Sequence, residues 1–298
     1  MIARDKPATA LILATLLGLS LTAGAVHGMV GHWQSNPILK EPVTVSVSAG
    51  SFAYRLSGEF RRDGAIVDAP LQRVTFEQPL TIMKYQVSLG EYQRCVAEGA
   101  CEPALGGNSL DSSLPTTGVS FEDALSYARW LSRRTGAQWR LPSDEEWAFA
   151  AGNRFADDAL GLSDVRDPSK RWLESYRREA SRESDADRTA KTPGFFGEND
   201  KGIVDAAGNV WEWTTSCFSR SRIASDGTVK LAETDNCGVR IAEGTHRAYV
   251  ISFLKDAQGS GCSSGRPPAN LGLRLVRDNG RQTRARSDLI GSVLESSW

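Results

Sequence analysis

Neither sign of charge dominates this chain of 298 residues, in which 35 lysines and arginines face 36 aspartates and glutamates for a formal net charge of -1. Proteins that bind nucleic acid through its phosphates carry an excess of basic residues, so we expect no nucleic-acid partner. Histidine is also scarce, with three residues, and beyond residue 26 no apolar run is long enough to cross a bilayer. A hydrophobic fraction of 40% with eight tryptophans is ample for a buried core.

The N-terminus carries the one long apolar run, over residues 8–26, after two basic residues and with the small residues Ala23-Gly24-Ala25 near its end. This pattern is typical of a secretory signal peptide. The alternative is an uncleaved N-terminal anchor, because ~20 apolar residues can span a bilayer. Either way we expect the protein in the periplasm, free or anchored to the inner membrane through its leader alone. The expected division is a leader over residues 1–28, one domain over 29–277 and a polar tail over 278–298.

Five cysteines in an exported chain predict disulfides, and the odd number leaves at least one cysteine without a partner in the chain. Cys95 and Cys101 flank a short segment that contains a glycine, and Cys217 and Cys237 flank a polar segment. We predict these two bridges, which leave Cys262 as a free thiol in a stretch rich in glycine and serine. Such a thiol is either reactive or paired with another protein.

Local patterns predict short strands and three helices. Alternating apolar and polar residues indicate strands at 43–47 and 52–54, and two more within 71–83. Serines followed three residues later by an acidic residue predict helix starts at Ser88, Ser120 and Ser143. From residue 153 to 191 the pattern weakens into mixed charge, and we expect an irregular excursion there. In the tail we expect a short helix from about Leu289.

Three ordered motifs carry a resemblance to a known family. The run from 202 to 213, Gly-Ile-Val-Asp-Ala-Ala-Gly-Asn-Val-Trp-Glu-Trp, places two tryptophans around a carboxylate. It follows Arg140-Leu-Pro-Ser-Asp-Glu-Glu-Trp147 and precedes Asn270-Leu-Gly-Leu-Arg274. Together they resemble the formylglycine-generating enzyme family, also called the sulfatase-modifying factor family, over roughly residues 43–277. The resemblance implies an α+β fold, related to C-type-lectin-like domains, with little regular secondary structure. Trp211 and Trp213 are expected in its core, since large aromatics dominate core burial.

The same motif offers oxygen ligands for a hard cation. Family members bind one calcium ion at positions that match Asp205, Gly208, Val210 and Glu212. The resemblance therefore implies a structural Ca²⁺ held by two carboxylates and two backbone carbonyls. The alternative is that Glu212 pairs with a buried arginine such as Arg140 or Arg274, because an isolated buried carboxylate is costly.

Catalysis in this family uses two cysteines, five positions apart, whose thiolates bind copper(I). Here the corresponding stretch holds Cys262 alone, and Ala257 stands where its partner would be, so we expect no copper centre. Nor can His27, His32 and His246 form the three-histidine iron site of another branch of the family. A pair of Cys262 and His246 is the remaining nucleophilic arrangement, and a structural role for His246 is its alternative.

Two classes of function remain: a non-catalytic regulatory or binding protein, which we favour, and an oxidative maturation enzyme, of the formylglycine-generating or another type, acting on a peptide. The layout resembles the periplasmic regulator of the threonine-phosphorylation pathway in type VI secretion. This resemblance implies docking on a periplasmic protein or peptide segment, such as that of a membrane kinase. The expected surface is a cleft formed by Trp211, Phe253, Cys262 and Arg266. A carbohydrate-binding, lectin-like module is a third alternative.

Overall fold

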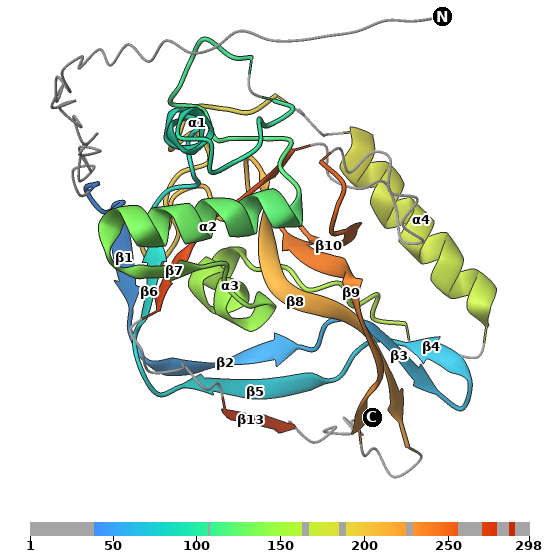
Figure 1. The fold of residues 1–298 in the computed structure, drawn as a ribbon. Helices are drawn as coiled ribbons and strands as arrows, with labels where there is room; N and C mark the ends of the chain where they lie inside the picture. The colour runs from blue at the N-terminus through green and yellow to red at the C-terminus, as the bar shows by residue number, and fades with distance from the viewer. Residues whose placement is uncertain are drawn as a thin grey trace, which may run out of the picture. The chain divides into compact units, whose positions relative to one another are not determined.

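The computed structural model describes residues 39–106, 108–162, 167–184, 189–224, 229–255, 270–278 and 286–289. Residues from Pro37 onward form one compact unit, in which helices pack against short, curved sheets (Figure 1). The predicted leader, Cys262 and Arg266 lie outside the described residues. Among the helices described, none is long and apolar enough to cross a membrane.

The described strands form three sheets. The first is antiparallel, in the order β1 (Thr44–Val47), β6 (Leu80–Met83), β12 (Val276–Asp278) and β7 (Gln138–Arg140). The second has the order β13 (Arg286–Leu289), β5 (Leu71–Phe76) and β2 (Gly50–Arg55). The third has the order β10 (Arg247–Ile251), β9 (Val229–Glu243), β8 (Trp211–Ile223), β3 (Glu59–Arg62) and β4 (Ala65–Val67), with β11 (Leu271–Gly272) parallel to β8. The strands predicted near 43–47, 52–54 and 71–83 are confirmed.

The three predicted helices are α1 (Leu89–Ala97), α2 (Phe121–Thr135) and α3 (Asp144–Ala151), and a 3-10 turn, η1 (Gly152–Arg154), follows the third. Each begins at its predicted serine, whose side chain accepts a backbone N–H while the third helical residue reaches back to the serine N–H. Gly136 ends α2 with φ of 76°, a left-handed conformation that glycine adopts without penalty.

The prediction of an irregular segment from 153 to 191 is wrong over Pro168–Ser184, which forms the helix α4 (yellow-green in Figure 1). Its apolar side chains Trp172, Leu173 and Tyr176 recur at helical spacing but are exposed. It is rich in Arg and Glu, which favour helices, and Glu174 pairs with Arg178 one turn later at 3.5 Å. Arg171 ties it to Asp68 at 2.8 Å. Ion pairs within the helix and to Asp68 therefore support a helix whose largest apolar side chains are exposed.

The expected helix from about Leu289 lies outside the described residues, and Arg286–Leu289 pairs as strand β13 with β5. An edge strand such as β5 presents unpaired backbone N–H and carbonyl groups that a passing segment can satisfy. Leu289 thus ends a strand, and the residues after it lie outside the described part.

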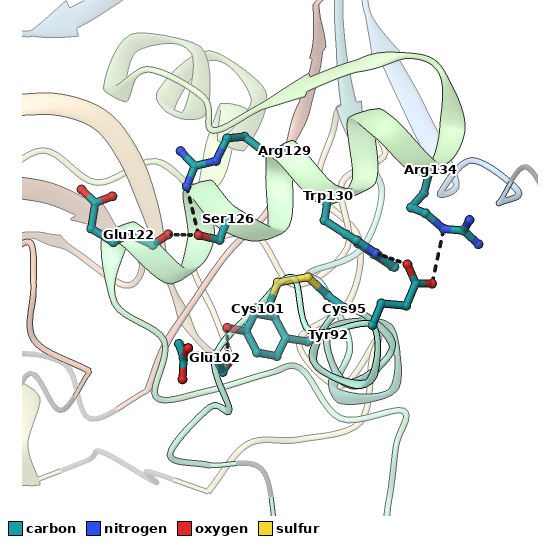
Figure 2. The surroundings of a disulfide bond; sticks show 10 residues. Tyr92, Cys95, Cys101, Glu102, Glu122, Ser126, Arg129, Trp130 and Arg134 are labelled. Carbon is teal, nitrogen blue, oxygen red and sulfur yellow. Dashed lines mark hydrogen bonds and ion pairs between the residues drawn. A yellow bond between two sulfur atoms is a disulfide. The ribbon is translucent and has the colours of Figure 1, made fainter. Parts of the chain in front are cut away.

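Both predicted disulfides are confirmed: Cys95–Cys101 and Cys217–Cys237. Figure 2 shows the first at the end of α1, where the indole of Trp130 on α2 donates to Glu98 at 2.8 Å. The second joins β8 to β9, so the polar segment that it encloses is the distal part of a hairpin rather than a loop. The first bridge therefore closes the turn that follows α1, and the second joins two paired strands.

Candidate functional site

The Gly-Asn-Val-Trp-Glu-Trp motif enters β8 from a loop with an unusual backbone. Asp205, Ala207 and Asn209 have φ values of 56°, 56° and 66°. Left-handed conformations cost a non-glycine residue roughly 1–2 kcal/mol, and Asn and Asp tolerate them best. Conformations of this kind persist only where the surroundings impose them. The loop must therefore be held by contacts outside itself.

Two side chains of the loop provide that support through the segment 191–196. The Asn209 amide accepts the N–H of Lys191 at 2.8 Å and donates to its carbonyl at 2.9 Å, in the manner of a paired strand residue. The Asp205 carboxylate accepts the N–H of Gly194 at 2.7 Å and of Phe196 at 2.8 Å. Both polar residues are thus engaged with the backbone of an adjacent segment.

Glu212, on β8, is fully buried and pairs with an arginine. Its Oε1 accepts from the Nη2 of Arg274 at 2.9 Å and from Gln86 at 2.8 Å. Its Oε2 accepts from the Nε of Arg274 at 2.9 Å and from the indole of Trp147 at 2.7 Å. A carboxylate has about four lone-pair positions, and four donors occupy them here. Of the two arginine partners considered from sequence, Arg274 pairs with Glu212, and Arg140 pairs with Glu146 at 2.6 Å.

Arg274 is equally saturated. Besides the two bonds to Glu212, its Nη1 donates to the carbonyls of Met83 and Lys84, and its Nη2 to that of Val204. A guanidinium has five N–H donors, and all five have acceptors. The last motif, Asn-Leu-Gly-Leu-Arg, therefore locks β8 to the loop after β6 through one buried ion pair.

The predicted calcium ligands divide into two groups. The carbonyls of Gly208 and Val210 and the Oε1 of Glu212 converge, but on the carboxamide nitrogen of Gln86, at 3.2, 3.4 and 2.8 Å. The Asp205 carboxylate is instead bonded to the segment 191–196. This arrangement does not fit a calcium ion, because the converging oxygens already share a protein donor. Within the described residues no group of three or more His, Cys, Asp or Glu side chains is placed to hold a metal.

Trp211 of the predicted cleft lies beside His246, which was predicted as a partner of Cys262. Their rings meet edge-on with centroids 5.3 Å apart, and the indole N–H donates to the His246 carbonyl at 3.0 Å. The Nδ1 of His246, a buried residue, lies 2.9 Å from the Arg247 carbonyl. Phe253 is 70% exposed. Because Cys262 lies outside the described residues, the Cys262–His246 pair stays a prediction. Trp213 is fully buried and donates to the Val119 carbonyl at 2.8 Å, which confirms its core position.

A second buried polar network was missed from sequence. Arg247 on β10 lies 2.9 Å from Glu243 on β9 and 3.1 Å from Asp144 on α3. It also contacts Asp158 at 2.9 Å, and the Tyr54 hydroxyl donates to Asp144. No role was predicted for Arg247 from the sequence. Its place at the start of the apolar run over residues 248–251 was the one signal that could have indicated burial and an acidic partner.

The carboxyls of Asp144 and Glu243 can lie close together because their pKa values are shifted in opposite directions. Burial, reinforced by the charge of Asp144, raises the pKa of Glu243 well above its usual value. Burial alone would raise the pKa of Asp144 too, but the Arg247 guanidinium and hydrogen bonds from Glu243 and Tyr54 hold it below its usual value. Because Glu243 keeps its proton, it can donate a hydrogen bond to Asp144. The network therefore places the Arg247 guanidinium beside one ionised and one protonated carboxyl.

The strand-and-loop geometry around Glu212 and Arg274, set in a mixed α+β unit, defines a domain of the sulfatase-modifying-factor type. The profile of the sulfatase-modifying factor enzyme 1-like domain matches residues 30–279, and the chain belongs to this family.

The relatives of this chain include proteins named as formylglycine-generating enzymes and proteins named as inactive ones. The chain is 29% identical over 194 residues to the inactive C-alpha-formylglycine-generating enzyme 2 of Bos taurus, covering 57% of this chain and 58% of that protein. It is 29% identical over 175 residues to the formylglycine-generating enzyme of Streptomyces coelicolor, covering 55% and 52%. The match thus spans little more than half the length of these relatives. The solved structure of PvdO from Pseudomonas aeruginosa, at 22% identity and a TM-score of 0.50 over 82% of this chain and 97% of that one, supports the fold.

Proposed function

We propose that this chain is an exported, non-catalytic binding or regulatory protein built on the formylglycine-generating-enzyme fold. The observation that carries this proposal is the pairing of the cysteines. Four of the five form two disulfides, so only Cys262 can supply a thiolate. A copper(I) centre of the family type needs two thiolates, and a single chain of this sequence cannot provide them.

The compartment and partner form the finer part of the proposal. Two disulfides indicate an oxidising environment, and a leader of the secretory type favours the periplasm. There the protein would dock on a periplasmic segment of another protein, for which the membrane kinase of a type VI secretion phosphorylation pathway is our candidate. The surface we assign to this contact includes Trp211, Phe253, Cys262 and Arg266.

The second candidate is an oxidative maturation enzyme that acts on a peptide. This candidate is supported because the chain is 29% identical both to a relative named as an active enzyme and to a relative named as inactive. Overall similarity therefore does not choose between them, and the single available thiol is what favours the binding protein.

One preparation of the purified protein tests both candidates. Oxygen consumption is followed after adding copper(I) and a cysteine-containing peptide, and bound copper is measured by metal analysis. We expect neither tight copper nor peptide-dependent oxygen uptake. Uptake that disappears in Cys262→Ser would overturn the proposal and establish the enzyme.

The partner is sought by crosslinking in the periplasm, with wild type and Cys262→Ser compared. We expect the same partner to be captured by both, because a binding protein does not need the thiol as a nucleophile. Loss of capture in a variant with unchanged melting temperature would show that the thiol itself makes the contact.

A further inference from the structure

We infer that the side-chain nitrogen of Gln86 takes, in this chain, the position that a cation takes in a calcium-binding loop. Three oxygens converge on it: Glu212 Oε1 at 2.8 Å, the Gly208 carbonyl at 3.2 Å and the Val210 carbonyl at 3.4 Å. These are three of the four groups that the family resemblance assigns to calcium. The segment 205–212 is therefore braced by a neutral donor and does not need the ion.

The chemistry of the neighbours decides which end of the Gln86 carboxamide faces them. Backbone carbonyls and an ionised carboxylate can only accept hydrogen bonds. A carboxamide oxygen in that position would bring four acceptors together without a proton, whereas the NH₂ group supplies donors to them. Gln86 is itself buried, so water cannot compensate for the wrong orientation.

Charge at this point also opposes an ion. The oxygen of Glu212 that a calcium ion would need lies 2.9 Å from the Nη2 of Arg274, so the guanidinium and the ion would repel each other across one atom. The other acidic residue of the motif, Asp205, is committed to the N–H groups of Gly194 and Phe196. Calcium takes six to eight oxygen ligands, and the charge of Glu212 is already neutralised.

The strained loop shows why something must occupy this position. With Asp205, Ala207 and Asn209 all left-handed, the carbonyls of Gly208 and Val210 face the same point as Glu212 Oε1. Buried carbonyls without a donor destabilise the folded state. Phe196 covers Gly208 so closely that a Cβ there would lie 2.7 Å from its ring, which excludes the bulk solvent that could otherwise supply the donors.

Thermal unfolding of the full chain, after EDTA treatment and again with added CaCl₂, tests the inference. We expect the same melting temperature in both, and no calcium binding by isothermal titration calorimetry. A structural calcium at a hundred times its dissociation constant would raise the melting temperature by about 5–10 °C. A rise of that size in the wild type would overturn the inference.

The variant Gln86→Glu tests the position itself. A second carboxylate facing Glu212 is expected to lower the melting temperature in EDTA, because four acceptors then converge without the donor that Gln86 supplies. The matched control is Gln72→Glu, since Gln72 is also buried and donates to a carboxylate, Glu145, at 3.3 Å, but no backbone carbonyls converge there. A Gln86→Glu variant that melts at the wild-type temperature in EDTA, or a control that is destabilised equally, would show that the donor of Gln86 does not brace this segment. If Gln86→Glu does not fold, the wild-type titration still decides whether calcium is needed.

Discussion

The hydrogen bond from Trp147 to Glu212 offers a sharp test of how the family motif holds this fold. The indole N–H lies 2.7 Å from Oε2, both residues are buried, and the acceptor is charged. A hydrogen bond to a charged group contributes about 1.5–3 kcal/mol, against about 0.5–1.5 kcal/mol for a neutral pair. Replacing Trp147 with Phe removes this donor and leaves a buried carboxylate oxygen with one partner fewer.

The loss of ring volume must be separated from the loss of the bond, and Trp139→Phe is the control. Trp139 is also buried, and its indole donates to a neutral acceptor, the hydroxyl of Thr135, at 3.0 Å. Both variants lose the same atoms, so the cavity cost largely cancels between them. We expect Trp147→Phe to lower the free energy of unfolding by about 1–2 kcal/mol more than Trp139→Phe.

Urea denaturation followed by circular dichroism measures this difference, with equal slopes required of both variants. In thermal unfolding the same difference corresponds to about 3–6 °C for a domain of this size. Equal costs for the two variants would refute the reasoning, because they would show that the charge of Glu212 does not strengthen the hydrogen bond from Trp147.

Two further predictions concern pH and the second disulfide. Burial, with the charges of Asp144 and Glu146 added, raises the pKa of Glu145 from 4.5 to about 7, so the folded protein keeps a proton that the unfolded chain releases. The contribution of Glu145 to the free energy of unfolding is then full below pH 4.5 and falls by up to about 3 kcal/mol as the pH rises through 7. Glu145→Gln should flatten this pH dependence in urea titrations at several pH values. Replacing Cys217 and Cys237 together with alanine opens a loop with a separation of 20 residues and should cost about 3 kcal/mol, whereas an unchanged unfolding midpoint would contradict that estimate.

Sequence patterns predicted the parts of the fold that depend on neighbouring residues. A capping box is complete within four residues, so α1, α2 and α3 could be placed from their serines. The same reasoning failed for α4, since Arg171 is held by Asp68 and the pair is separated by 103 residues. The hairpin of β8 and β9 was also missed, because its outer part is polar on both strands.

The candidate site shows the same limit. The residues of the Gly-Asn-Val-Trp-Glu-Trp motif were identified from sequence, and three of the four predicted oxygens do converge. The atom between them belongs to Gln86, which is 122 residues from Gly208, and no local pattern marks it. Likewise, no local pattern marks the network of Arg247, because its acidic partners come from α3 and β9 and meet only in the folded chain.

Polar side chains of the three motifs make hydrogen bonds to other groups within the fold. Arg274 gives three of its donors to backbone carbonyls and two to Glu212, Asn209 pairs with the backbone of Lys191, and Trp213 donates to Val119. Leaving either member of the buried ion pair alone would cost about 3–5 kcal/mol, so a chain needs these residues in order to fold, whether or not it catalyses a reaction. The motifs therefore identify the domain and are silent on its chemistry. That question depends on the thiols, of which this chain has one outside its disulfides.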